Sequence, residues 1–290
     1  MRISVVIRRY IKVLAKDAQP PSLHYLQRAV GTVSLSVAAC KIRGSRLVDL
    51  REQGSLRTVF PRPSQHEVTA VILNTAGGVA AGDRFTIDAS VAENAQLSIT
   101  TQAAERIYGA PDQTIGRIQT TLTVQSGARI NWLPQETILF DGCRLNRALN
   151  VEVAADATFL MVEPIVFGRT ASGEVIHSGY FNDRVRISSE GRPVYFDSIQ
   201  MSGDMTAALN RSAVGRKARA VASMVFFNAH AADHLQSVRR LLPDTAGASL
   251  ISDTLMTIRI LAEDSFALRQ ALLPILDLLT DNAMPKNWKL

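Results

Sequence analysis

Apolar and polar residues alternate over short stretches between residues 29 and 200, which is the pattern of half-buried β-strands. The alternation is regular at 32–37 and at 118–124, and it recurs from Val151 to Val153. Turn-forming residues separate these stretches, at Gly44, Gly54, Asn94, Gly127, Asp156 and Gly191. Because long helical periodicity is missing before residue 220, the chain is predicted to be predominantly β rather than a βαβ alternation.

Three segments repeat the same pattern: 91–99 (VAENAQLSI), 124–132 (VQSGARINW) and 153–161 (VAADATFLM). Each has a valine, two variable residues, Asn, Gly or Asp, then an alanine and two alternating apolar positions. Because the three segments begin at similar intervals along the chain, each is able to form one unit stacked on the next. The pattern predicts a stacked-strand, β-helix-like core; three unrelated hairpins with the same turn chemistry are the alternative.

If the repeats stack, the residues that follow each of them lie along one edge of the stack. These residues are polar or charged: Thr101, Gln102, Gln135, Glu136 and Glu163. A buried carboxylate or amide without a partner is costly, so a buried edge needs water, a cation or a partner molecule. A solvated edge is equally compatible with the spacing.

The chain after residue 219 follows a different pattern. An apolar run at 220–228 predicts a buried strand, and 233–242 predicts a helix with one apolar stripe. A strand is predicted at 250–261 and a second helix at 264–279, which makes a small β-α-β-α portion. The predicted organisation is therefore a flexible basic tail at 1–20, a β-rich core at 21–215, and an α/β portion at 216–290 that packs on the core.

The densest glycine cluster, Gly77, Gly78 and Gly82, follows the apolar stretch at 68–73. A phosphate-binding loop of a nucleotide site is followed by a helix, whereas the residues at 85–91 alternate like a strand. The cluster therefore favours a tight turn that another group approaches closely.

Patterns typical of catalytic or metal sites are weak. Cys40 and Cys143 lie far apart, which argues against a disulfide framework or zinc site and favours a reducing, cytoplasmic location. His230 and His234 have the i, i+4 spacing of zinc ligands, but no HExxH pattern accompanies them, and they are expected on the surface. With no nucleophile motif in the chain, no catalytic residue is predicted.

The charge and hydropathy of the chain limit its partners. No apolar run approaches the roughly 18–20 residues that a membrane-spanning helix needs, and the N-terminal apolar stretch at 3–7 is too short for a signal peptide. The net charge is +6, but residues 1–20 carry five basic residues and one acid, so the chain after residue 20 is close to neutral. Of the 32 basic residues 26 are arginines, which favours protein interfaces over a nucleic-acid or membrane partner.

Four segments together resemble one known family. They are 74–83 (NTAGGVAAGD), 100–108 (TTQAAERIY), 132–142 (WLPQETILFDG) and 163–174 (EPIVFGRTASGE). In their order and spacing they are similar to UreD, also called UreH, a family of urease accessory proteins, and the resemblance runs from about residue 28 to 288. Residues 74–76 read Asn-Thr-Ala where the family usually has Asn-Pro-Pro, and residues 1–20 precede the family's usual start.

The resemblance implies a non-catalytic maturation factor with a β-helix-like fold. Such a protein binds the urease apoprotein and recruits UreF, which brings the GTPase UreG, and nickel passes through a polar tunnel to the urease active site. No cofactor is expected to stay bound, since scattered oxygen ligands hold nickel weakly and suit an ion in transit.

The polar residues of the family motifs are then the expected lining of the nickel path: Asp83, Gln102, Gln135, Glu136, Asp141, Glu163 and Glu174. The glycines of the motif loop, Gly77, Gly78 and Gly82, accompany them. The alternative function is a β-helical carbohydrate-active enzyme that uses Glu136, Asp141 or Glu163, although the aromatic content of 6% offers few platforms for sugars.

Overall fold

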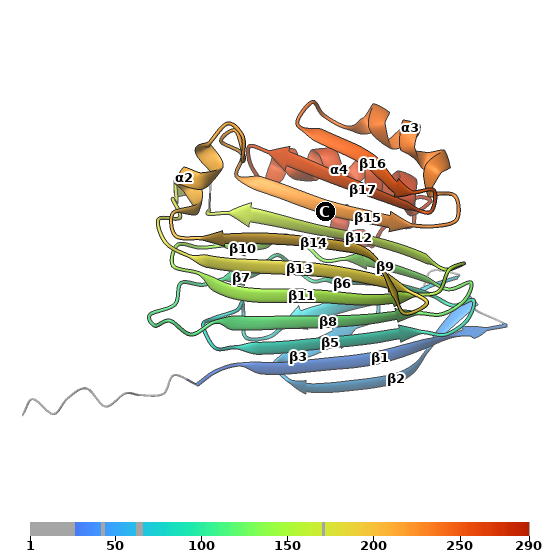
Figure 1. Cartoon of the computed structure of the whole chain (residues 1–290). Coiled ribbons are helices and arrows are strands. Elements are labelled where there is room, and N and C mark those ends of the chain that lie inside the picture. The colour runs from blue at the N-terminus through green and yellow to red at the C-terminus, as the bar shows by residue number, and fades with distance from the viewer. Residues whose placement is uncertain (1–26, 42–43, 62–65, 170–171, 290) are drawn as a thin grey trace, which may run out of the picture.

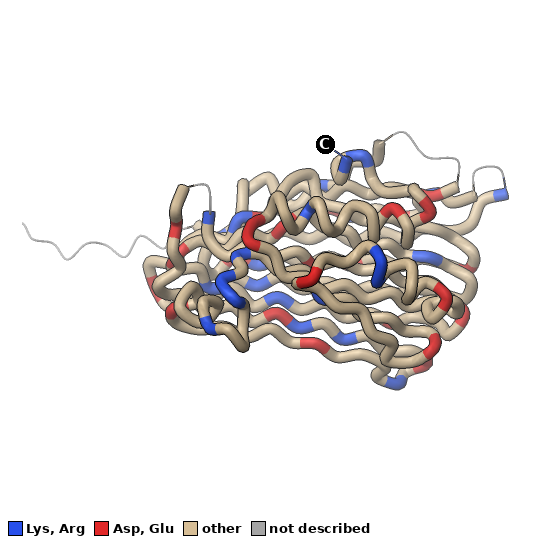
Figure 2. The backbone as a smooth tube through the Cα atoms, turned by 90° about the horizontal axis from the view of Figure 1, so that it is seen from above, with Lys and Arg blue, Asp and Glu red and all other residues tan. Residues whose placement is uncertain are grey.

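Two β-sheets stack face to face and carry the helices at one side (Figure 1). The computed structural model describes residues 27–41, 44–61, 66–169 and 172–289. The predicted tail at 1–20 lies outside the described residues. Basic and acidic residues are interspersed along the molecule, as Figure 2 shows from above, in keeping with the near-neutral charge of the chain after residue 20.

The first sheet has seven strands and faces the viewer in Figure 1. Its strands, in spatial order, are β14 (Arg192–Ser202), β13 (Tyr180–Ser189), β11 (Arg144–Val153), β8 (Gly116–Val124), β5 (Arg84–Val91), β1 (Val30–Cys40) and β2 (Gly44–Gly54). Neighbours from β1 to β13 are parallel, whereas β2 and β14 pair antiparallel at the two edges.

The second sheet has ten strands and lies behind the first. Its main path is β16 (Ala246–Ser252), β17 (Leu255–Ala262), β15 (Ala220–Phe227), β12 (Thr158–Phe167), β9 (Arg129–Leu133), β6 (Gln96–Thr101), β4 (Val68–Asn74) and β3 (Leu56–Val59). Two short strands, β7 (Glu105–Ile107) and β10 (Thr137–Leu139), lie off this path, with β10 parallel to both β7 and β12. From β4 to β13 the chain passes back and forth between the sheets, so each turn adds one coil to a β-helix.

The three repeated segments stack in register, as predicted. Val91 and Val153 both pair with Val124 in the first sheet, and Ile99 and Met161 both pair with Trp132 in the second. The turns between them also stack, because the Arg129 amide donates to the Ala95 carbonyl and the Thr158 amide to the Ala128 carbonyl, both at 2.9 Å. The repeats are therefore successive coils rather than hairpins.

The C-terminal portion extends the second sheet. Strand β15 pairs antiparallel with β12, and β17 and β16 follow it outward. Helices α3 (Ala231–Leu241) and α4 (Ser265–Leu279) pack on the outer face of this sheet in a separate apolar cluster, which also includes Leu133 and Trp288. The predicted strand at 250–261 is in fact the hairpin β16–β17, because residues 253–254 form a turn.

The described part of the chain also contains two short helices. Helix α2 (Met205–Asn210), which no sequence pattern predicted, is capped at its start by the Asp204 carboxylate, which accepts from the Ala207 amide. A 3-10 helix, η2 (Lys286–Trp288), lies just before the last described residue, and its Trp288 is completely buried.

Candidate functional site

The glycine loop after β4 is held by its own side chains. Asn74 accepts from the Ala76 amide at 3.0 Å and donates to the Gly78 carbonyl at 2.9 Å. Gly78 has φ +150°, and a Cβ placed there would lie 2.4 Å from the Tyr108 ring, so a side chain would clash. Tyr108 also donates its hydroxyl to the Gly77 carbonyl at 2.9 Å. The group that approaches this turn closely is thus an aromatic ring of the same chain.

Asp83 closes the same loop from the other side. Its Oδ1 accepts from the Ala29 amide at 2.8 Å and its Oδ2 from the Ala80 amide at 2.7 Å. The residue is buried, and both of its carboxylate oxygens accept from backbone donors of the loop.

A cavity of about 210 Å³ lies between the two sheets beside this loop. Its apolar lining includes Leu56, Ile72, Phe85, Ile87 and Ile118, and its polar lining includes Asn74, Thr101, Gln102 and Glu105. Asn74 donates its Nδ2 to both oxygens of Glu105, at 3.1 and 3.3 Å. Burial raises the pKa of Glu105 to about 7, against the lowering effect of the Asn74 hydrogen bond. This carboxyl therefore changes charge near neutral pH.

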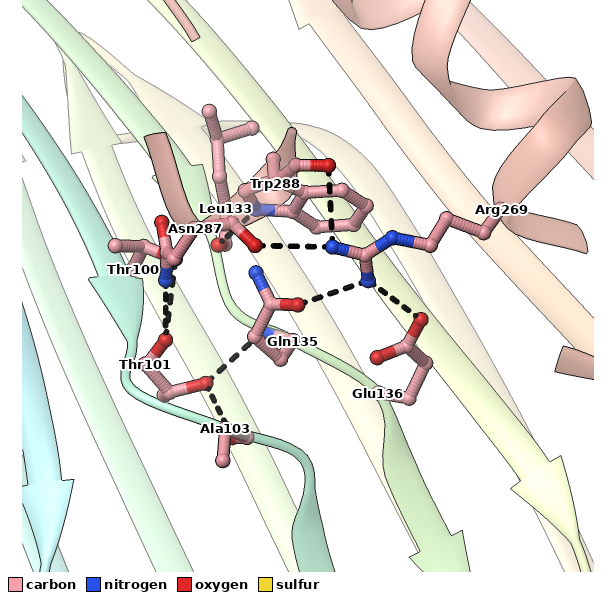
Figure 3. Close-up of polar contacts among 9 residues, drawn as sticks. All are labelled: Thr100, Thr101, Ala103, Leu133, Gln135, Glu136, Arg269, Asn287 and Trp288. Atoms are coloured by element: carbon pink, nitrogen blue, oxygen red, sulfur yellow. Dashed lines mark hydrogen bonds and ion pairs between the residues drawn. The ribbon is translucent and has the colours of Figure 1, made fainter. Parts of the chain in front are cut away.

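Gln135 and Glu136 meet a cation from the C-terminal portion (Figure 3). Arg269 on α4 donates its Nη1 to Oε1 of Gln135 at 2.9 Å and to Oε1 of Glu136 at 3.0 Å. Its Nη2 donates to the carbonyls of Asn287 and Trp288, at 3.0 and 3.1 Å. The cation that a buried edge of the stack was expected to need at Glu136 is therefore the guanidinium of Arg269, from the same chain.

The C-terminal residues fasten to the same edge. Asn287 donates its Nδ2 to Thr100 Oγ1 at 3.1 Å and to the Thr101 carbonyl at 2.6 Å, as Figure 3 shows. Trp288 donates its indole N–H to the Leu133 carbonyl at 2.9 Å, and the Arg269 guanidinium lies 5.0 Å from its ring centroid. Helix α4 and η2 therefore hold two successive coils together.

Glu163 belongs to a second, fully buried charge cluster between the sheets. Arg147 donates its Nε and Nη2 to the two oxygens of Asp183, at 2.9 and 2.6 Å, and its Nη1 lies 2.6 Å from Glu163 Oε2. Glu163 Oε1 accepts from the Trp132 indole at 2.7 Å, and Thr137 accepts from Arg147 at 3.0 Å. One arginine thus joins carboxylates from both sheets, and burial raises the pKa of Glu163.

Asp141 and Glu174 build a turn near the surface. Asp141 accepts from the amides of His177 and Ser178, at 2.8 and 3.0 Å, and donates its own amide to Glu174 at 3.3 Å. Glu174 also pairs with Arg169 at 2.9 Å, and this hydrogen-bonded guanidinium holds the pKa of Glu174 below its usual value. Arg169 in turn lies over the Phe140 ring, 4.5 Å from its centroid.

The seven residues expected to line a nickel path thus lie in separate groups. Gln135 and Glu136 share Arg269, Asp141 and Glu174 share a turn, and Glu163 and Asp83 each have partners of their own. Of the seven, Gln102 lines the cavity that contains Glu105. The three carboxylates of the alternative enzyme, Glu136, Asp141 and Glu163, likewise fall into three different groups.

Sequence reasoning missed five charged residues of these groups: Glu105, Arg147, Arg169, Asp183 and Arg269. Arg147 and Asp183 carry a readable signal, because each stands at an inward, apolar position of its alternating strand. A charged residue at a position where the alternation places apolar residues indicates a buried ion pair. Glu105 lies within a quoted family segment but follows two alanines, and nothing in the local sequence of α4 distinguishes Arg269 from a solvated residue.

The two histidines with the spacing of zinc ligands lie outside these groups. His230 is exposed and lies 3.3 Å from Asp233, and His234 packs edge-on against Phe226 at 5.5 Å between ring centroids. In the part of the chain that the structure describes, no three His, Cys, Asp or Glu residues come together as a metal site. The same part contains no helix long and apolar enough to cross a membrane.

Comparison with known proteins identifies the family. The family model described as UreD urease accessory protein matches residues 29–289. The chain belongs to the UreD family of urease accessory proteins. It is 42% identical over 264 residues to the urease accessory protein UreD of Roseobacter denitrificans, covering 91% of this chain and 96% of the relative. It is 46% identical over 244 residues to the UreD protein of Ruegeria pomeroyi, covering 84% and 95% of the two chains.

The family match covers nearly all of the described fold. The matched region includes both sheets, α3, α4 and η2, so the C-terminal residues that supply Arg269 and Trp288 are part of the family domain. The four segments that carried the resemblance lie on successive coils. One residue of each segment marks the stacking: Val79 pairs with Ile107, Ile107 with Leu139, and Leu139 with Phe167, all in parallel.

The buried charge cluster makes a prediction about stability. Arg147→Met leaves the carboxylates of Asp183 and Glu163 buried without a cation, so the free energy of unfolding should fall by about 3–5 kcal/mol. Glu163→Gln should cost clearly less, because the amide oxygen still accepts from Trp132 and Arg147 keeps Asp183. Urea unfolding measures both, with exposed Arg240→Met as the control. Equal stability of the Arg147 variant and the control would contradict the assigned role.

The raised pKa of Glu105 predicts a pH-dependent stability. Between about pH 4.5 and 7 the folded chain binds the proton that the unfolded chain has released, so this group's contribution to stability falls as pH rises. Glu105→Gln cannot ionise, and its stability relative to the parent chain should rise from pH 5 to pH 8 by at most roughly 3 kcal/mol.

Urea unfolding at the two pH values measures this effect. Glu174→Gln is the matched control, because the lowered pKa of Glu174 places its own pH dependence below about pH 4.5. Above that value Glu174 is ionised in both the folded and the unfolded chain. The stability of Glu174→Gln relative to the parent should therefore stay constant from pH 5 to pH 8. A Glu105→Gln difference that is equally constant would contradict the assignment.

Proposed function

We propose that the chain is a cytoplasmic, non-catalytic urease maturation factor that binds the urease apoprotein, recruits UreF and through it the GTPase UreG, and conducts nickel to the urease active site. Membership in a family of urease accessory proteins over residues 29–289 supports the urease part of this proposal. The chain holds two cysteines, far apart in the sequence, which is in keeping with a reducing compartment.

The nickel part of the proposal depends on the cavity beside the glycine loop. Glu105, Asn74, Thr101 and Gln102 give it carboxylate, amide and hydroxyl oxygens, and the rest of its lining is apolar apart from Arg106. A carboxyl group whose pKa is about 7 exchanges a proton for a cation with little cost, which suits an ion that must enter and leave. This pairing of a partly buried carboxyl with a cavity is the observation that carries the nickel path.

Glu105 and Gln102 are therefore the proposed first contacts of nickel. The other candidates, Asp83, Gln135, Glu136, Asp141, Glu163 and Glu174, would contact the ion only by releasing the partners described above. Their ion pairs and backbone hydrogen bonds keep the coils in register around the path.

Glu105→Gln should slow urease activation several-fold while leaving the complex intact, because the amide keeps the Asn74 hydrogen bond but loses the charge that attracts nickel. The variant is co-expressed with urease, UreF and UreG, and urease activity, nickel content and the recovered complex are measured together. Glu93→Gln, an exposed residue in the turn after β5, is the control for the same chemical change.

Two results would contradict this assignment. Activation at the parental rate would show that Glu105 does not contact the ion. Loss of the complex in parallel with activation would show that Glu105 acts on the structure alone.

A further inference from the structure

The outer face of the seven-stranded sheet is flat and open. Helices α3 and α4 pack on the ten-stranded sheet, and Figure 1 shows the seven-stranded sheet toward the viewer with no helix in front of it. Every second residue of β5, β8, β11, β13 and β14 points outward, and most of these side chains are polar. Parallel sheets are usually covered on both faces, so this open face requires a physical account.

Arginines gather on this face. Arg84 on β5 and Arg117 on β8 are register partners on adjacent strands, and both are exposed. Arg184 and Arg186 project from β13 on the same side. In the described ranges none of these four side chains has an ion pair or hydrogen bond. Like charges on neighbouring strands repel, so the pairing of Arg84 with Arg117 lowers the stability of the sheet.

Aromatic rings accompany the arginines. Phe196 on β14 is 61% exposed and pairs with Arg186, so the two side chains share one face of the sheet. Arg144 on β11 lies over the ring of its register partner Tyr180, 5.5 Å from the centroid. Arginine and aromatic side chains are enriched among the residues that contribute most of the binding energy at protein–protein interfaces.

The charge of the face limits its occupant. From β5 to β14 the paired outward positions carry five arginines, at 84, 117, 144, 184 and 186, and two carboxylates, Asp88 and Glu152. A second copy of the chain placed face to face would bring arginines against arginines. Residues 1–20 have a net charge of +4, the same sign as the face. Complementarity therefore requires an acidic partner.

We infer that this arginine face, defined by Arg84, Arg117, Arg144, Arg184, Arg186 and Phe196, is a docking surface for a folded protein that presents a flat acidic patch. The inference rests on the proposed function in one respect, since the partner is taken to be a member of the urease maturation complex. The face lies on the outside of the sheet, away from the cavity of Glu105, so docking and nickel transfer are separable.

A charge-reversal experiment tests the inference. The tagged full chain, as the parent or as Arg117→Glu/Arg184→Glu, is co-expressed with the urease subunits, UreF and UreG, and the recovered complexes are quantified at low and high salt. The parent chain should retain one of these proteins at low salt and lose it as salt rises, and the double variant should retain about tenfold less of it. Arg240→Glu on α3, away from the face, is the matched control and should bind like the parent.

Further variants keep the test independent of folding. Arg117→Gln/Arg184→Gln removes the charge more gently, and a thermal melt of each chain shows that it is folded. The neutral variant should lie between the parent and the reversed variant in binding. Phe196→Ser should weaken the same interaction without changing its salt dependence.

The outcomes separate the two claims. A parent chain that recovers urease, UreF or UreG, together with reversed variants that recover them equally, would overturn the docking face and leave the proposed function standing. A parent chain that recovers none of them would overturn the proposed function and the inferred partner together. Arginine-dependent dimers of the chain in sedimentation, or arginine-dependent retention of a DNA oligonucleotide, would overturn the choice of an acidic protein.

Discussion

Parallel pairing of successive coils in register is the constraint on which the rest of this structure depends. Val91, Val124 and Val153 form one row in the first sheet, and Ile99, Trp132 and Met161 form another in the second. Residues at equal positions of successive coils must therefore lie side by side. Three of the four family segments follow the repeats, so their polar residues recur on successive coils, where their charges have to be neutralised.

Two arginines perform most of this neutralisation. Arg147 joins Asp183 in one sheet to Glu163 in the other, and Arg269 joins Gln135 and Glu136 to the C-terminal residues. Each guanidinium offers several donors in a fixed plane, so one side chain satisfies partners on different strands. The carboxylates of the motifs thus fix the relative position of sheets and helices, and Glu105 is left beside a cavity with an amide as its partner.

The sequence allowed the stacking to be predicted because the repeats keep both the turn residue and the alternation of the strands. It also allowed the two C-terminal helices to be predicted, although the strand before α4 proved to be a hairpin. The role of Arg269 was not predictable, because it lies 133 residues from Glu136 and only the packing of α4 brings them together. The cavity of Glu105 depends on side chains from both sheets, and no local pattern specifies such a space.

The nickel content of urease tests the central claim most directly. Urease is purified from cells that express its subunits with UreF and UreG, with or without this chain, and nickel is measured per urease active site. The account predicts urease with little nickel in the absence of the chain and a large increase in its presence. Equal nickel content in the two preparations would contradict it.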